Sequence, residues 1–354
     1  MKDGTTMDPT IAHHDAPASD DLIARLPKAE LHLHLEGTIA PKTLWDMARS
    51  NHVALPVNSL DELKGMYRFT SFASFIELWL LMCSCMRTPD DYLRMVDAFV
   101  SECRRQNIRY SELHFTPYNH EKLGIGGRRA LQIVSKRLME AESAGGPVVR
   151  LITDIPSEAG PPSADYTLAL LEEESNPLVV ALGLGGPEGG ISRSQFSRWF
   201  ERARRAGYWT VAHAGETAGA AHVREAVVDL GVRRVQHGVR AVEDPEVLRL
   251  LAERRICCDV AITSNVCLNV VPSLSAHPLR MLLNAGVPVT LSTDDPPFFT
   301  TDLLLEWRRA RELGLNLGEL WELNLNGLRF GLAETAVRRR LLLEFIEEGK
   351  RLSS

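Results

Sequence analysis

Two histidines and a glutamate alternate with leucines across residues 31–36 of the chain. The side chains of a β-strand point alternately to its two faces, so His32, His34 and Glu36 share one face. Two imidazoles facing an apolar interior need a partner, because a buried polar group without one costs about 1–3 kcal/mol. A metal ion would satisfy both imidazoles, although an isolated H-x-H also arises by chance in alternating strands.

Groups of the same chemical type recur where later predicted strands end. His213 closes the fifth predicted strand, His237 closes the sixth, and Asp294 with Asp295 closes the eighth. The carboxyl ends of barrel strands meet at one face, and barrel enzymes carry their chemistry there. Three imidazoles and one carboxylate suit Zn²⁺, although other divalent first-row ions would also fit. We therefore predict one zinc ion per chain, five-coordinate so that a water is retained, held by His32, His34, His213 and Asp294.

The elements that must position these groups alternate between short β-type runs and longer helical patterns from Leu22 onward. This alternation predicts an α/β fold, a (β/α)8 TIM barrel in one domain over residues 21–354. Residues 1–20 are polar and without periodicity, and are expected to form a disordered N-terminal tail. Seven of the eight predicted strands are closely followed by helical patterns; the strands are placed at residues 30–35, 109–115, 148–155, 179–184, 209–213, 234–237, 256–262 and 287–293.

The connection between the first two predicted strands has about 70 residues, far more than an ordinary connection in such a fold. It predicts a helical insertion, and in residues 69–82 the side chains Phe72, Phe75, Ile76 and Trp79 fall at helical spacing. One interpretation is a helix packed on the barrel. The other is a cap whose aromatic face closes over a flat substrate. An insertion directly after the first strand lies at the catalytic mouth, so both interpretations can hold.

Composition narrows the classes of function. The chain has 354 residues, 45% hydrophobic and 24% charged, with a formal net charge of -6. A negative charge argues against a nucleic-acid-binding surface. The sequence contains neither a long apolar run nor a signal-peptide pattern, so a membrane or secreted protein is disfavoured. The six cysteines lack the C-x-x-C spacing of a structural zinc site and are interpreted as reduced thiols of a cytoplasmic protein. Composition does not indicate an oligomeric state.

Several segments resemble the adenosine deaminase family of the amidohydrolase superfamily, in the family's order and spacing. The resemblance covers about residue 25 to the early 300s. It implies zinc-dependent hydrolytic deamination of a small 6-aminopurine, by default adenosine to inosine with release of ammonia. The matching segments are P-K-A-E-L-H-L-H-L-E-G-T from Pro27, H-A-G-E from His213, V-R-E-A-V from Val223, Q-H-G from Gln236, T-S-N from Thr263 and S-T-D-D-P from Ser292.

The resemblance also implies a role for each matching residue. A bound metal lowers the pKa of water towards 7 and supplies hydroxide for attack at purine C6. Glu216 must then be protonated, which requires an apolar or carboxylate-rich setting that raises its pKa. The implied roles are zinc binding by His32, His34, His213 and Asp294, protonation of N1 by Glu216, assistance to the hydroxide by His237, contact with N7 by Asp295, and a backbone amide offered to the ring by Gly186.

Some positions depart from the family pattern. Glu36 stands where adenosine-acting members usually carry an Asp that reaches the ribose, and H-L-E-G-T resembles the adenine-acting branch. G-L-G-G-P-E and the D-I-P-S-E-A-G from Asp154 are more similar to actinobacterial aminodeoxyfutalosine deaminases, which act on an adenine nucleoside with a bulky aromatic acid at the 5′ position. Gln236 replaces the usual Gly, and residues 261–262 are Ala-Ile where Cys-Pro is usual. Adenine and aminodeoxyfutalosine therefore stay open as substrates beside adenosine.

Two other kinds of function stay open. A zinc hydrolase acting on an ester, lactone or amide could use the same scaffold, although Glu216 with Asp295 suits a heteroaromatic ring better. A purine-binding protein without turnover is suggested by the changes at Gln236 and residues 261–262. Since no basic cluster for a phosphate is obvious, a nucleoside or base is expected rather than a nucleotide. Two groups are expected to support the site or the fold: Ser264 and Asp259 would orient ligands, and His114, His120 and His222 would be structural or solvated.

Overall fold

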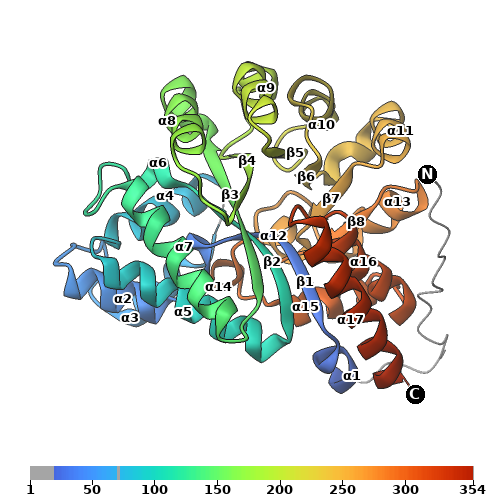
Figure 1. Cartoon of the computed structure of the whole chain (residues 1–354), viewed down its shortest axis with the longest axis horizontal. Coiled ribbons are helices and arrows are strands. Elements are labelled where there is room, and N and C mark those ends of the chain that lie inside the picture. The colour runs from blue at the N-terminus through green and yellow to red at the C-terminus, as the bar shows by residue number, and fades with distance from the viewer. Residues whose placement is uncertain (1–19, 70–71, 354) are drawn as a thin grey trace.

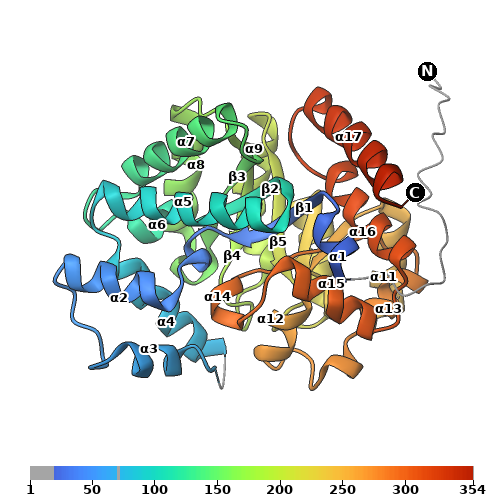
Figure 2. The same ribbon diagram turned by 90° about the horizontal axis from the view of Figure 1, so that it is seen from below.

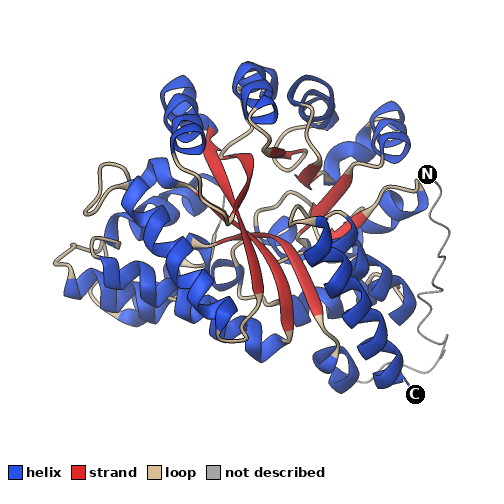
Figure 3. Ribbon diagram, in the orientation of Figure 1, coloured by secondary structure: helices blue, strands red, loops and turns tan. Residues whose placement is uncertain are grey.

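The eight strands form one parallel sheet that curls into a barrel (Figures 1 and 3). The computed structural model describes residues 20–69 and 72–353. Each strand pairs with its neighbours in chain order, and β8 meets β1 through the bridge between Leu33 and Asp294. The predicted (β/α)8 barrel is confirmed, with strands β1 (Lys28–His34), β2 (Ile108–Phe115), β3 (Val148–Pro156), β4 (Val179–Gly185), β5 (Trp209–Ala214), β6 (Arg234–His237), β7 (Cys257–Val260) and β8 (Val289–Leu291).

The last two strands are shorter than the sequence pattern predicts. After β7 the chain turns at once into a helix, because the backbone N–H groups of Ile262 and Thr263 donate to the Glu306 carboxylate. After β8 the backbone N–H of Thr293 donates to the Glu30 side chain, 2.9 Å away, instead of to a neighbouring strand. Both early ends turn the chain at the carboxyl side of the barrel, where the predicted ligands lie.

Helices surround the strands on the outside (Figure 3). Between β5 and β6, a short α-helix, α10 (Ala220–Glu225), is followed directly by a π-helical segment, Ala226–Leu230. The helices outside the insertion are α1 (Asp20–Arg25), α6 (Pro117–His120), α7 (Gly127–Ser143), α8 (Gly160–Glu173), α9 (Ser197–Arg205), α10 (Ala220–Glu225), α11 (Pro245–Arg254), α12 (Ile262–Cys267), α13 (Leu279–Asn284), α14 (Pro296–Phe299), α15 (Leu303–Glu312), α16 (Leu317–Arg329) and α17 (Thr335–Ser353).

The long connection after β1 is a helical insertion, as predicted. It contains α2 (Pro41–Ser50), α3 (Leu60–Met66), α4 (Phe72–Cys85) and α5 (Pro89–Gln106). Helices α2, α3 and α4 gather on one side of the barrel, at the left of Figures 1 and 2. The helix predicted at residues 69–82 is α4, displaced by three residues towards the C-terminus.

Apolar side chains fill the space between the strands and the helices. Every residue of β3 is buried, as expected for a strand covered on both faces. Asp20 begins α1, and the rest of the predicted tail, residues 1–19, lies outside the described residues. Within residues 20–69 and 72–353, no helix has both the length and the apolar character needed to cross a membrane.

Candidate active site

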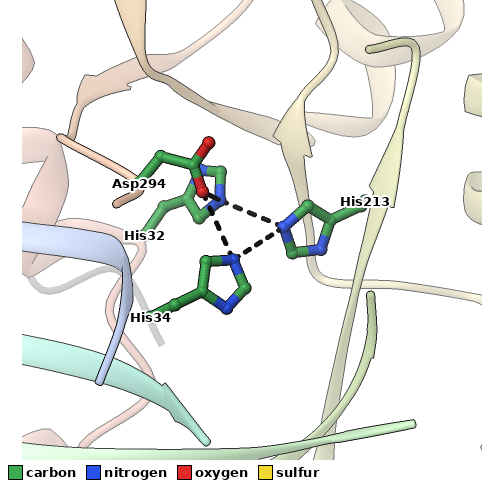
Figure 4. A group of neighbouring side chains, drawn as sticks. All are labelled: His32, His34, His213 and Asp294. Carbon is green, nitrogen blue, oxygen red and sulfur yellow. Dashed lines mark hydrogen bonds and ion pairs between the residues drawn. The ribbon is translucent and has the colours of Figure 1, made fainter. Parts of the chain in front are cut away.

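Four predicted ligands converge at the carboxyl end of the barrel (Figure 4). His32 and His34 come from β1, His213 from β5, and Asp294 from the turn after β8. The Nε2 atom of His213 lies 3.1 Å from the Nε2 atoms of both His32 and His34. The Asp294 Oδ1 atom lies 3.2 Å and 3.3 Å from the same two nitrogens of β1. Four donor atoms from three distant segments therefore face one small volume.

The hydrogen bonds behind these imidazoles indicate that the volume suits a cation. The Nδ1 atom of His32 lies 3.1 Å from the carbonyl oxygen of Asp259, and that of His213 lies 3.0 Å from the carbonyl oxygen of Leu184. A carbonyl oxygen only accepts, so each Nδ1 carries a proton, and each ring presents a lone pair at Nε2 when it is neutral. Two lone pairs 3.1 Å apart repel each other unless a cation lies between them. The donor set thus fits a divalent metal ion.

The charges around the cluster point to the same conclusion. Burial by itself raises the pKa of Asp294, but the neighbouring imidazoles, His32 first, outweigh it and hold the pKa well below its usual range. Positive charge is therefore stabilised here. The Ser264 hydroxyl donates to the second oxygen of Asp294 at 2.7 Å and orients the carboxylate, as the sequence suggested.

The backbone is strained at two residues of the site. His237 has a φ of 63° and Asp294 a φ of 65°, in the left-handed region that residues other than glycine seldom adopt. Such a conformation costs about 1–3 kcal/mol and persists only where surrounding contacts fix it. The strained backbone at His237 and Asp294 carries side chains that face the site: both residues line the cavity described next.

A cavity lies over the cluster, with about 610 Å³ of empty space when the part open to solvent is included. Its apolar wall comes from α4, which packs against α2, α6 and the 3-10 helix after β1, so the predicted cap helix faces the candidate substrate space. Its lining consists of His34, Phe72, Phe75, Ile76, Trp79, Leu80, Thr116, Asn119, Asp154, Pro156, Glu158, Gly185, Gly186, His213, Glu216, His237, Asp294 and Asp295.

Three predicted proton-transfer or contact groups lie in the same cavity. The Glu216 Oε1 atom is 3.6 Å from the Nε2 atom of His237, which in turn is 3.9 Å from the second oxygen of Asp294. Burial raises the pKa of Glu216 well above its usual range, and the carboxylate of Asp294 adds to the effect. Burial and Asp294 raise the pKa of Asp295 in the same direction. Both side chains are therefore favoured as neutral acids that can donate a proton.

Glu188 supports the loop that carries Glu216, and the sequence reasoning missed it. Its carboxylate is fully buried and accepts from three consecutive backbone N–H groups, those of Gly215, Glu216 and Thr217, at 2.8, 2.8 and 2.9 Å. Consecutive N–H groups pointing into one concavity bind an anion well. The signal that could have identified it is the glutamate that ends the G-L-G-G-P-E segment.

The substrate-binding residues predicted around the purine differ in where they lie. Gly186 lines the cavity with a φ of +81°, and a Cβ there would collide with the Glu158 carboxylate, so only glycine fits. Glu36 is fully buried and accepts from the backbone N–H of Thr116 at 2.8 Å, with His120 3.3 Å away. The described residues that line the cavity do not include Glu36. Its contact with a substrate stays a prediction.

Asp259 and His114, which the sequence predicts as supports of the site or the fold, lie beside the cluster. Asp259 acts on His32 through its carbonyl oxygen, while its carboxylate pairs with Arg234 at 2.7 Å. His114 is buried and lies 3.0 Å from the Asp154 carboxylate beside the cluster, a structural role within the site. Gln236 is buried, and neither it nor residues 261–262 belong to the described cavity lining. Those departures from the family pattern therefore lie behind the cavity wall.

With this geometry in place, comparison with known families is decisive. Residues 27–348 match the family model described as adenosine deaminase. The chain belongs to the adenosine deaminase family. The resemblance seen in the sequence is thus confirmed, and the protein is a hydrolase of this family in which three imidazoles and a carboxylate lie close enough together to hold a metal ion.

Named relatives fall into two groups. An aminodeoxyfutalosine deaminase of Streptomyces coelicolor is 38% identical over 322 residues, covering 90% of this chain and 83% of the relative. An adenine deaminase of Cupriavidus necator is 32% identical over 327 residues, covering 91% and 92%. The crystal structure of an adenine deaminase from Arthrobacter aurescens superposes with a TM-score of 0.87 at 30% identity, covering 91% of this chain and 98% of that one.

Proposed function

We propose that this protein is a zinc-dependent aminohydrolase that replaces the 6-amino group of a 6-aminopurine nucleoside with oxygen and releases ammonia. The observation that carries the proposal is the cluster of three Nε2 atoms and one carboxylate oxygen at the base of a cavity that also holds Glu216, His237 and Asp295. Three imidazoles with one carboxylate favour zinc among the divalent ions.

Each residue around the cavity has a definite task in this reaction. A divalent metal held by the cluster would supply a water activated for attack at neutral pH. Glu216, favoured as a neutral acid, gives purine N1 a proton and so withdraws electrons from C6. Purine N7 is an acceptor, so Asp295 contacts it as a neutral acid, in accord with its raised pKa. The backbone N–H of Gly186 is offered to the ring.

The shape of the cavity favours a nucleoside over a bare base. Once N1 lies at Glu216 and C6 at the metal cluster, the N9 substituent must extend away from them towards the outer wall. That wall is formed by apolar side chains of α4, including Phe72, Ile76 and Trp79. It can pack against an aromatic 5′ substituent, which accords with the aminodeoxyfutalosine deaminases among the relatives. Adenosine fits the same position with less apolar contact.

Adenine itself is the second candidate, because adenine deaminases are found both among the sequence relatives and among the similar structures. The deciding experiment measures ammonia release by the zinc-loaded protein on adenine, adenosine, 2′-deoxyadenosine, 5′-deoxy-5′-methylthioadenosine and aminodeoxyfutalosine. We expect turnover of at least one nucleoside, with the highest kcat/KM for the one with an aromatic 5′ group. No turnover of any of the five would refute the proposal, and turnover of adenine alone would replace it with the second candidate.

A variant pair ties the activity to the site. Glu216→Gln removes the proton that N1 requires, so it should abolish turnover while the metal content stays unchanged. Glu201→Gln changes a carboxylate of α9 that pairs with Arg205 on the surface, and it should leave turnover unchanged. Retained turnover in Glu216→Gln would remove Glu216 from its role.

A further inference from the structure

A chain of three hydrogen bonds, which we call the relay, runs from the backbone of α13 through His277 and Asn265 to His237. The backbone N–H of Leu279 lies 3.2 Å from Nδ1 of His277. The Nε2 atom of His277 lies 3.1 Å from the side-chain oxygen of Asn265, and the side-chain nitrogen of Asn265 lies 3.1 Å from Nδ1 of His237. His277, Asn265 and His237 are all buried.

The direction of every bond in this chain follows from its first member. A backbone N–H can only donate, so Nδ1 of His277 must be the acceptor and Nε2 must carry the ring proton. The Asn265 atom that receives this proton must then be its oxygen. The amide nitrogen of Asn265 is left to donate to Nδ1 of His237. The backbone donor thus settles an amide orientation and two tautomers that side chains alone would leave ambiguous.

The charge state of both rings is settled by the same contacts. A protonated His277 would oppose its Nδ1–H to the N–H of Leu279, and a protonated His237 would oppose its Nδ1–H to the amide of Asn265. Burial lowers the pKa of His277 to about 4, which agrees with a neutral ring. Neutral His237 therefore carries its proton on Nε2, the atom that faces the cavity and has no hydrogen-bond partner within residues 20–69 and 72–353.

We propose that Asn265 and His277 are positioning residues that lock His237 in its Nε2-protonated tautomer. His237 then donates a hydrogen bond from Nε2 into the cavity and has no lone pair there with which to take a proton. On the proposed function, this donor meets the oxygen that adds to purine C6. His237 holds and stabilises that oxygen, while the proton for N1 comes from Glu216.

The tautomer can be measured without any substrate. Long-range ¹H–¹⁵N spectra of zinc-loaded, ¹⁵N-histidine-labelled protein distinguish protonated from unprotonated ring nitrogens, and a His237→Asn sample assigns the signals. We expect His237 protonated at Nε2 alone. A His237 signal protonated at Nδ1, or at both nitrogens, would overturn the proposal.

Variants at the two positioning residues test the effect on turnover. In Asn265→Asp the new carboxylate can only accept hydrogen bonds from the two rings, so the His237 proton should move to Nδ1. We expect kcat to fall by about 10²- to 10⁴-fold, with little change in KM or metal content. His277→Gln keeps a donor to Asn265 and should stay within about threefold of the wild-type kcat, whereas His277→Met removes it and should lower kcat by about tenfold. Equal kcat in the Gln and Met variants would contradict the relay.

Failure of this inference can be told apart from failure of the proposed function. An inactive wild-type protein whose His237 is protonated at Nε2 would refute the function and leave the relay intact. An active wild-type protein whose His237 is protonated at Nδ1 would refute the relay and leave the proposed function intact. If Asn265→Asp does not fold, the spectra of His277→Met decide: a mixture of His237 tautomers supports the relay, and a single unchanged tautomer refutes it.

Discussion

Replacing Glu188 with Gln should disturb catalysis, although Glu188 itself is not among the described residues that line the cavity. The carboxylate accepts from the backbone N–H groups of Gly215, Glu216 and Thr217. In the variant, the amide oxygen can keep the bonds to Glu216 and Thr217, but the amide NH₂ then faces the N–H of Gly215. One unpaired buried N–H costs about 1–3 kcal/mol, and the loss of charge in the other two bonds adds to it. A neutral amide is easier to bury than a carboxylate, which offsets part of this cost. We therefore expect the free energy of unfolding to fall by about 2–3 kcal/mol.

The same change should shift the loop that places Glu216. A displacement of about 1 Å in a catalytic group lowers turnover about 10²-fold, so kcat/KM should fall by about that factor. The assays are urea unfolding, steady-state deamination and metal analysis, with metal content expected to stay near one per chain. The matched control is Glu225→Gln, because the Glu225 carboxylate likewise accepts from Ser192 and two backbone N–H groups but does not support the Glu216 loop.

The control should keep its kcat/KM within about twofold of wild type, even where it loses stability. If Glu188→Gln also keeps its kcat/KM within that margin while its stability falls, Glu188 only stabilises the fold. The reasoning that links this carboxylate to the position of Glu216 would then be refuted.

Three further changes probe the closest packing, the metal ligands and the buried charge. Gly37→Ala puts a Cβ into the Asp295 carboxylate and should lower kcat/KM at least about tenfold. Gly65→Ala, which has open space around it, is the control and should leave kcat/KM unchanged. Equal kcat/KM in the two variants would contradict the close contact between Gly37 and Asp295. Ser264→Ala removes the donor to a ligand carboxylate and should weaken metal affinity about 10–100-fold in a chelator competition; unchanged affinity would exclude an orienting role. Burial lowers the pKa of Lys28 from 10.5 to about 7, so the unfolded chain binds more protons between these values and the free energy of unfolding should rise from pH 7 to pH 10. Urea unfolding at several pH values should show this rise relative to Lys28→Met, and parallel curves would contradict it.

Much of the site could be predicted because barrel strands place their carboxyl ends together. His32 and His34 alternate on one strand, His213 lies near the end of β5, and Asp294 follows β8, so the strand order brings distant residues to one face. The same periodicity located the eight strands. The strand ends were less predictable, because the Glu30 and Glu306 carboxylates capture the backbone after β8 and β7.

Supporting residues could not be predicted in the same way. Glu188 lies after β4 and His277 lies before α13, and neither position has a periodicity that indicates its partner. Their partners are fixed by loop conformation, such as the turn at Gly215 with a φ of 70°. Glu36 shows the reverse case: it alternates with the histidines in the sequence, but β1 ends at His34. Glu36 begins a 3-10 helix, and its carboxylate accepts from the backbone N–H of Thr116.

The proposed reaction requires one divalent metal ion among His32, His34, His213 and Asp294. The most direct test is anomalous X-ray diffraction from crystals of the zinc-loaded protein, recorded on both sides of the zinc edge. We expect one strong peak per chain within coordination distance of these four side chains. A folded, active protein with no anomalous peak at that position, or with imidazoles pointing apart, would contradict it.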